Sequence, residues 1–178
     1  ATIEGWMAAD PELKEWEYYF SEMWRQQTHT LSAEGERLMA IAGRMAATPS
    51  DAHEALLGVD IAFPTVTSSK GDTLNLGLSS FGTYRAHLDP QVRTQTRDAF
   101  FSTLRKYENT FSVFLDGVVK NHIANKEARN YETCREAALS PDNITTQTYD
   151  NLVNTVRQNL PRTLHKYVEL RRKVLGLD

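Results

Sequence analysis

Residues 89–126 read DPQVRTQTRDAFFSTLRKYENTFSVFLDGVVKNHIANK, and this stretch decides the fold class. Asp89 is a favourable N-cap, and Pro90 suits the first turn of a helix because a backbone N–H there would have no partner. Apolar side chains then recur at steps of three and four, at Phe100, Leu104, Tyr107, Phe111, Phe114, Leu115 and Val118. This spacing puts them on one helical face, so it predicts one long helix packed among other helices.

The helical period extends to both sides of this stretch. Asp10-Pro11, Ser32 and Thr145 each stand where a capping residue is expected before an apolar run. Further helices are predicted over residues 10–27, 32–45, 131–139, 145–160 and 164–175, with a short one from residue 48. We therefore expect a mainly α fold, a multi-helix and bundle-like segment.

One segment, at about residues 60–78, has the period of strands instead. Residues 61–67 are rich in strand formers, and residues 68–72 have turn chemistry. Leu74, Leu76 and Leu78 then alternate with smaller or polar residues, which predicts a β-hairpin. The expected organisation is N-terminal helices over 1–58, the hairpin over 59–78 and a long-helix bundle over 79–178, together one helical lobe.

The charge of the chain is uneven and argues against a nucleic-acid partner. Residues 1–60 carry 11 acidic and 4 basic side chains, the remainder carries 12 and 16, and the net charge is −3. Domains that bind nucleic acid are normally basic, with aromatic side chains among the charges. No run of about 18 apolar residues is present, so we expect no membrane span. The single cysteine, Cys134, fits a reducing compartment.

The sequence offers one near match to a zinc-peptidase motif, His53-Glu54-Ala55-Leu56-Leu57. A zinc-binding helix of this kind needs histidines at positions i and i+4, so that both imidazoles face one metal, with a Glu beside the first as base. Leu57 stands in the second place. We therefore expect no metal ligand and no catalytic residue in this chain.

Two other pairs of ionisable side chains lie one helical turn apart. His165 and Glu169 could face one metal ion, and Glu132 and Glu136 could do acid–base work. Neither pair comes with a predicted cleft or a third ligand. An exposed ion pair and an exposed charge cluster are therefore the favoured interpretations.

A series of short motifs resembles the oligoendopeptidase F family, the bacterial branch of the thimet-oligopeptidase-like zinc peptidases. The matching stretches are residues 31–34 (LSAE), 63–65 (FPT), 89–93 (DPQVR), 107–110 (YENT), 128–131 (ARNY), 136–139 (EAAL), 143–144 (NI), 149–152 (YDNL), 160–161 (LP), 164–165 (LH) and 167–177 (YVELRRKVLGL). Each stretch is short, but in this order they cover nearly the whole chain. The resemblance is to the N-terminal and middle helical region of the family.

The resemblance implies that the intact protein is a cytoplasmic zinc metalloendopeptidase that hydrolyses short peptides. The family's H-E-x-x-H helix has no counterpart in this chain, which is therefore expected to be an internal, non-catalytic portion that binds no zinc itself. It would form part of the wall of the substrate channel and contact the remaining catalytic lobe. Such a portion should expose an apolar surface where the rest of the enzyme covers it.

The polar residues to test first within the matching motifs are Arg129, Tyr131 and Asn143. They could be contacts to the peptide substrate or hydrogen-bonded structural anchors, and the second interpretation is favoured. The alternative for the whole chain is a stand-alone helical protein-interaction module with no enzymatic activity. An H-E-x-x-H motif downstream in the same reading frame would exclude that alternative.

Overall fold

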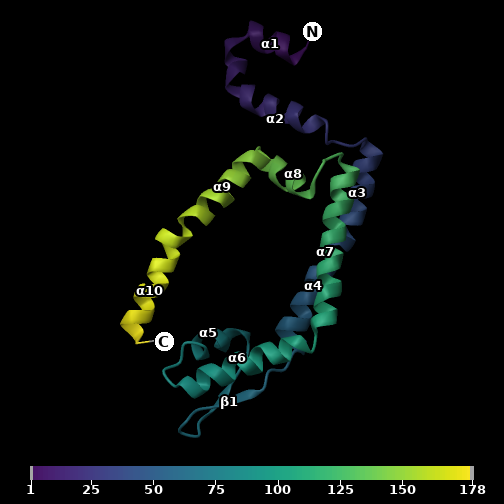
Figure 1. Cartoon of the computed structure of the whole chain (residues 1–178). Helices are drawn as coiled ribbons and strands as arrows, with labels where there is room; N and C mark the ends of the chain where they lie inside the picture. Colours follow the sequence, from purple (N-terminus) through teal and green to yellow (C-terminus); the bar gives the residue numbers. More distant parts are fainter. Residues whose placement is uncertain (1, 177–178) are drawn as a thin grey trace. The chain divides into compact units, whose positions relative to one another are not determined.

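The computed structural model of the protein describes residues 2–176, and these are mainly helical (Figure 1). The predicted mainly α class with one β-hairpin is confirmed. The chain divides into two compact units: a terminal unit of residues up to 29 and from 125 on, and a central unit of residues 30–124. Within the described range, no helix is long and apolar enough to cross a membrane.

The central unit contains the hairpin. β1 (Thr65–Thr67) pairs antiparallel with β2 (Thr73–Asn75), and Thr65 lies opposite Asn75. The turn between them is held by Ser68, whose N–H donates to the Asp72 carbonyl at 2.9 Å. The Ser68 hydroxyl oxygen also accepts the Asp72 N–H at 3.0 Å. The residues predicted to form the turn therefore do so.

The hairpin is shorter than the predicted 60–78. Before it, Leu56–Asp60 forms a π-helical turn, η2, and Pro64 has no N–H with which to extend the ladder of β1. After it, α5 (Leu78–Tyr84) begins at the third of the alternating leucines. The alternation thus predicts Leu78 wrongly, because α5 starts without a side-chain cap that the sequence could reveal.

The core of the central unit lies where α6 (Pro90–Arg105) packs on β1 and α5. The side chains buried together there are Val66, Leu76, Val92 and Phe100. The ring of Phe100 stacks on Phe63, at 4.8 Å between centroids, and on Phe81, at 4.0 Å. Because burial of apolar surface is the dominant stabilising term in folding, this cluster fixes the hairpin against α6.

The longest predicted helix is in fact two helices. α6 ends at Arg105, and α7 (Glu108–Ala128) runs in a different direction (Figure 1). Between them, the N–H groups of Lys106 and Tyr107 donate to carbonyls three residues back, at 3.2 and 2.9 Å. No Gly or Pro marks this break. Its cause is tertiary, because α6 packs on the hairpin whereas α7 packs on α4 (Thr48–Ala55), and one straight helix cannot do both.

Two helices of the central unit, α3 and α4, begin where the sequence predicts. The Ser32 hydroxyl oxygen accepts the N–H of Gly35 at 3.1 Å before α3 (Ala33–Ala46). Pro49 stands in the first turn of α4, and α7 passes so close that a Cβ on Gly117 would lie 2.7 Å from Pro49 Cγ. The lack of a side chain at Gly117 lets these two helices approach each other.

The described part of the terminal unit is built from helices, joined by short turns. In chain order they are α1 (Ile3–Ala9), η1 (Pro11–Trp16), α2 (Glu17–Gln27), α8 (Cys134–Leu139), η3 (Ser140–Asp142), α9 (Thr146–Asn159), η4 (Leu160–Arg162) and α10 (Leu164–Leu175). The Asp10 carboxylate accepts the Glu12 N–H at 3.0 Å, and the Thr145 hydroxyl accepts the Thr148 N–H at 3.1 Å. Both predicted caps are confirmed.

α8 begins three residues later than predicted. Asn130 has a positive φ of 56° and turns the chain after α7. Thr133 then caps α8 by accepting the Glu136 N–H at 3.0 Å. The Glu136 carboxylate reaches back to the N–H of Glu132 at 2.9 Å, so Glu136 serves as a capping residue rather than as half of an acid–base pair.

The terminal unit exposes much of its apolar surface. None of its described side chains is fully buried. Large apolar side chains are instead exposed on its helices, among them Trp6, Tyr18, Leu152 and Val174. The expected exposed apolar surface is therefore present, and monomeric domains rarely leave so much of it uncovered.

Candidate functional site

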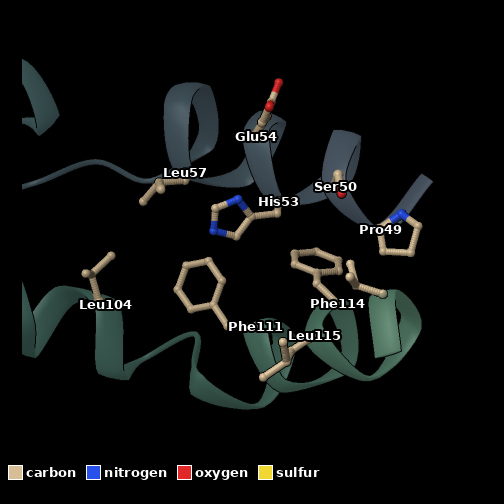
Figure 2. A pocket seen from close by; sticks show the side chains of 10 residues that line it. Pro49, Ser50, His53, Glu54, Leu57, Leu104, Phe111, Phe114 and Leu115 are labelled. Carbon is tan, nitrogen blue, oxygen red and sulfur yellow. The ribbon is translucent and has the colours of Figure 1, made fainter. Parts of the chain in front are cut away.

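His53 and Glu54, from the near match to a zinc-peptidase motif, point in different directions from α4 (Figure 2). The His53 ring enters an apolar pocket of about 630 Å³. The centroid of this ring lies 5.4 Å from that of Phe111 and 6.5 Å from that of Phe114, both on α7. The Glu54 carboxylate points away from these rings. Both residues line the pocket, but only the His53 ring is turned towards the aromatic side chains, so the two side chains do not converge on one point.

Zinc, which the resemblance implies for the intact enzyme, does not fit the residues around His53. Leu57, one turn further along, presents a hydrocarbon side chain to the same pocket (Figure 2). Across the part of the chain that the structure describes, no three His, Cys, Asp or Glu side chains come together as a metal site requires. His165 and Glu169 both lie exposed on α10. The pocket is a surface for apolar contact and not for metal chemistry.

The three candidate residues, Arg129, Tyr131 and Asn143, lie in one hydrogen-bonded network of the terminal unit. The Arg129 guanidinium donates to the His29 carbonyl at 3.1 Å, and His29 Nδ1 donates to the Arg129 carbonyl at 2.8 Å. Because a carbonyl oxygen only accepts, Nδ1 of His29 carries the proton. The Tyr131 ring stacks on the His29 ring. These contacts fix His29, which follows α2, to the turn after α7.

The network continues through Ser140 to α2. The Ser140 hydroxyl oxygen accepts from the Tyr131 hydroxyl at 3.2 Å and from the Arg25 guanidinium at 3.1 Å. Arg25 Nε also donates to the Glu22 carboxylate at 3.1 Å, and this hydrogen bond lowers the pKa of Glu22. Asn143 Nδ2 donates to the other Glu22 oxygen at 2.9 Å. The polar network comprises Glu22, Arg25, His29, Arg129, Tyr131, Ser140 and Asn143.

A pocket of about 490 Å³ lies beside the polar network. Its lining is mostly polar or charged: Arg25, His29, Glu132, Thr133, Arg135, Glu136, Ser140, Asn143, Ile144, Thr145 and Thr146. Of the three candidates, Asn143 lines this pocket, whereas Arg129 and Tyr131 hold the His29 that lines it. The pocket can offer hydrogen-bond donors and acceptors to a polar group. Arg129 and Tyr131 are placed to position one of its walls.

Four members of the polar network are not predicted by the sequence: Glu22, Arg25, His29 and Ser140. Their contacts join distant parts of the chain, and Arg25 and Ser140 are 115 residues apart. No local spacing encodes such a contact. The one local signal is the step of three between Glu22 and Arg25, which is typical of an ion pair on a helix.

Known proteins similar to this chain are peptidases. The family model described as Oligopeptidase F matches residues 1–63. Oligopeptidase PepF of Bacillus subtilis is 34% identical over 167 residues, which are 94% of this chain and 25% of the relative. The plasmid oligoendopeptidase F of Lactococcus lactis subsp. cremoris is 30% identical over 172 residues, which are 97% of this chain and 28% of the relative. The chain thus spans about a quarter of the length of these curated relatives.

A solved structure is similar as well. The crystal structure of oligoendopeptidase-F from Enterococcus faecium matches this fold with a TM-score of 0.83 and 32% sequence identity. The match covers 99% of this chain and 35% of the Enterococcus chain. It extends far beyond residue 63, and so it includes the motifs of the central and terminal units that the family model does not reach.

Proposed function

The resemblance to the oligoendopeptidase F family is confirmed over nearly the whole chain, and from it we propose that the chain is the non-catalytic helical portion of a zinc-dependent oligoendopeptidase. The intact protein would hydrolyse short peptides in the cytoplasm. The observation that carries this proposal is the match of 99% of this chain to part of a solved oligoendopeptidase-F. Sequence and fold agree along the same stretch, which chance similarity of helices would not produce.

Zinc and its ligands are proposed to lie in the remaining, catalytic lobe of the intact protein. The packing of His53 supports this division, because its ring contacts Phe111 and its neighbour one turn on is Leu57. A zinc site needs further donor atoms within about 2.0–2.3 Å of the metal. The side chains beside this imidazole are instead those of Phe111, Phe114 and Leu57.

The role proposed for this chain is to form part of the substrate-channel wall and to contact the catalytic lobe. In this proposal residues 1–58, 59–78 and 79–178 act together as one lobe. The polar network supports the idea of a rigid wall, because it ties α2 to residues 129–143 by hydrogen bonds. Arg129, Tyr131 and Asn143 would then be anchors of the wall, and the short peptide would be the partner of the intact enzyme.

A peptidase assay tests the proposal. We expect the full-length protein to cleave a quenched fluorescent peptide and to lose this activity when a chelator is added. The purified 178-residue chain should neither cleave the peptide nor retain zinc. Chelator-sensitive cleavage by the 178-residue chain would contradict the proposal that the zinc and its ligands lie in the remaining lobe. A full-length protein without peptidase activity would overturn the enzymatic assignment and favour the stand-alone module.

A further inference from the structure

α9 and α10 each carry an apolar stripe that is open to solvent. Along α9, the stripe consists of Tyr149, Leu152 and Val156, at steps of three and four. Along α10, it consists of Leu164, Tyr167, Val168, Val174 and Leu175, which fall on one side of the helix. These eight residues, here called the α9–α10 stripe, are between 41% and 75% exposed. Every residue from 161 to 176 is exposed.

Such helices are not stable when they stand alone in water. The stability of a protein helix comes mostly from packing its apolar face, and isolated helices shorter than about 12–15 residues are marginal. α10 has 12 residues and α9 has 14. Contiguous exposed apolar side chains on a helix mark a surface that another element covers. The α9–α10 stripe therefore requires a partner.

The charges beside the stripe indicate the chemistry of that partner. The basic side chains of this region are Arg157, Arg162, Arg171 and Arg172, whereas Lys166 and Lys173 lie on the opposite side of α10. Glu169 is the one acidic residue of α10. The Arg171 guanidinium lies over the Tyr167 ring, 5.7 Å from its centroid, and so extends the basic character to the edge of the stripe. A complementary surface is apolar at its centre and acidic at its rim.

We propose that the α9–α10 stripe docks an apolar, acid-rimmed surface of the same polypeptide, from the part that lies outside these 178 residues. This rests on the part of the proposed function that makes the chain one lobe of a longer protein. The length of the relatives supports it, because this chain covers 25% of the Bacillus protein and 35% of the Enterococcus structure. In a protein as long as these relatives, most of the residues lie outside the matched region and are available to cover the α9–α10 stripe.

Hydrogen exchange tests the docking directly. The probe is the amide exchange of peptides from residues 146–175, followed by mass spectrometry in the full-length protein and in the 178-residue chain. Covered helices open less often, and we expect exchange to be about 100-fold slower in the full-length protein. The difference should not depend on protein concentration, and the full-length protein should be a monomer in the same sample.

A matched pair of variants locates the contact on one face of α10. Val168 lies in the stripe, and Lys166 lies on the opposite side of the same helix, so each is replaced by Gln. We expect Val168→Gln to speed exchange of residues 146–175 by about tenfold in the full-length protein, because it places an unpaired amide in an apolar contact. Lys166→Gln should leave exchange unchanged, and neither variant should matter in the 178-residue chain.

The other possible occupants give different results. Protection that grows with the concentration of the 178-residue chain would assign the stripe to a second copy, and protection that needs added peptide would assign it to substrate. Either result would overturn the proposal, as would equal exchange in the long and short chains. A peptidase assay on the same sample distinguishes failure of the proposed peptidase function from failure of the proposed docking. If the full-length protein is inactive but α9 and α10 are protected from exchange, the peptidase function is contradicted and the docking is supported.

Discussion

The imidazole of His29 lies flat on the phenol ring of Tyr131, with 3.7 Å between the ring centroids and 13° between the planes. The two residues are far apart in the sequence, and the pair sits at the centre of the polar network. The hydroxyl of Tyr131 and the ring of Tyr131 make separate contacts, one to Ser140 and one to His29. Substitutions can therefore remove them one at a time.

Tyr131→Phe should lower the free energy of unfolding by about 1 kcal/mol, the usual cost of one lost neutral hydrogen bond. Tyr131→Leu should cost about 1 kcal/mol more, because it also removes the stacking on His29. Urea denaturation of the purified chain measures both. Equal losses in the two variants would mean that the ring contact contributes nothing.

Asn143 allows the anchor and substrate-contact interpretations to be separated. It has a left-handed backbone, with φ of 53°, and its side chain donates to Glu22. Asn143→Gly keeps this backbone accessible and should cost about 1 kcal/mol, whereas Asn143→Ala adds about 1–2 kcal/mol for the left-handed conformation. In the proposed full-length peptidase, we expect KM for short peptides to stay unchanged in both. A higher KM with unchanged stability would make Asn143 a substrate contact.

Asp89 predicts a specific pH dependence of stability. Its carboxylate accepts the N–H of Ser69 at 2.7 Å and that of Gln91 at 2.9 Å, and chiefly the bond from Ser69 lowers its pKa from 3.8 to about 2. Between these values the unfolded chain binds more protons, so stability rises with pH. The contribution is present above about pH 4 and is lost as the pH falls towards 2.

The variant Asp89→Asn isolates that contribution. It cannot titrate, so its stability should be flatter than that of the parent between pH 4 and pH 2. The variant should also be less stable than the parent at neutral pH, because Ser69 and Gln91 donate to different oxygens of Asp89 and an amide has only one oxygen to accept them. Guanidinium denaturation at several pH values across this window gives the two slopes. Parallel curves for parent and variant would show that another group causes the pH dependence.

Two glycines in helices should respond in opposite ways to alanine. Gly117→Ala puts a Cβ 2.7 Å from Pro49 Cγ, and we expect a loss of about 1–3 kcal/mol despite the better helix propensity of alanine. Gly43 lies in α3, and apart from its chain neighbours and its own helix backbone no atom of the described residues lies within 4 Å of its Cβ position. Gly43→Ala should therefore stabilise the chain by about 0.5–1 kcal/mol. Thermal melts followed by circular dichroism measure both, and a stabilising Gly117→Ala would refute the close approach of α4 and α7.

Two buried threonines of α6 form a second matched pair. Thr96 is 0% exposed and its hydroxyl has no hydrogen-bond partner among residues 2–176, whereas Thr103 is 4% exposed and its hydroxyl donates to the Ala99 carbonyl at 2.8 Å. Thr96→Val should be neutral or stabilising by up to about 1 kcal/mol, because it removes an unpaired polar group. Thr103→Val should cost about 1 kcal/mol. Denaturant midpoints show which of the two variants is less stable. A larger loss of stability in Thr96→Val than in Thr103→Val would show that the Thr96 hydroxyl has a hydrogen-bond partner.

The sequence predicts helices well where a cap and an apolar period coincide. Thr145 with the stripe of α9 is the clearest case, and Ser32 with α3 is another. Prediction fails where tertiary contacts, and not the local sequence, determine where a helix begins or ends. The break after Arg105 has no local signal, because α6 packs on β1 and α5 whereas α7 packs on α4. Leu78 alternates like a strand residue and yet begins a helix.

The candidate residues show the same limit in another form. Family motifs direct attention to Arg129, Tyr131 and Asn143, and the structure brings these three into one network. The residues that join them, His29 and Ser140, belong to no pattern of fixed spacing. Their contacts form only when two segments distant in sequence meet in the folded protein, and local sequence patterns carry no information about such a meeting.

The pairing of α2 with residues 129–143 has a consequence for the order in which the protein is made. Arg25 leaves the ribosome long before Ser140, its partner 115 residues later. At roughly 5–20 residues per second, translation imposes a wait of about 6–23 s. During that time the only elements of its own unit available to α2 are α1 and η1, which precede it in the chain, and its contacts to residues 129–143 cannot form. Chaperone capture of the nascent chain should therefore peak before residue 140 emerges and decline afterwards.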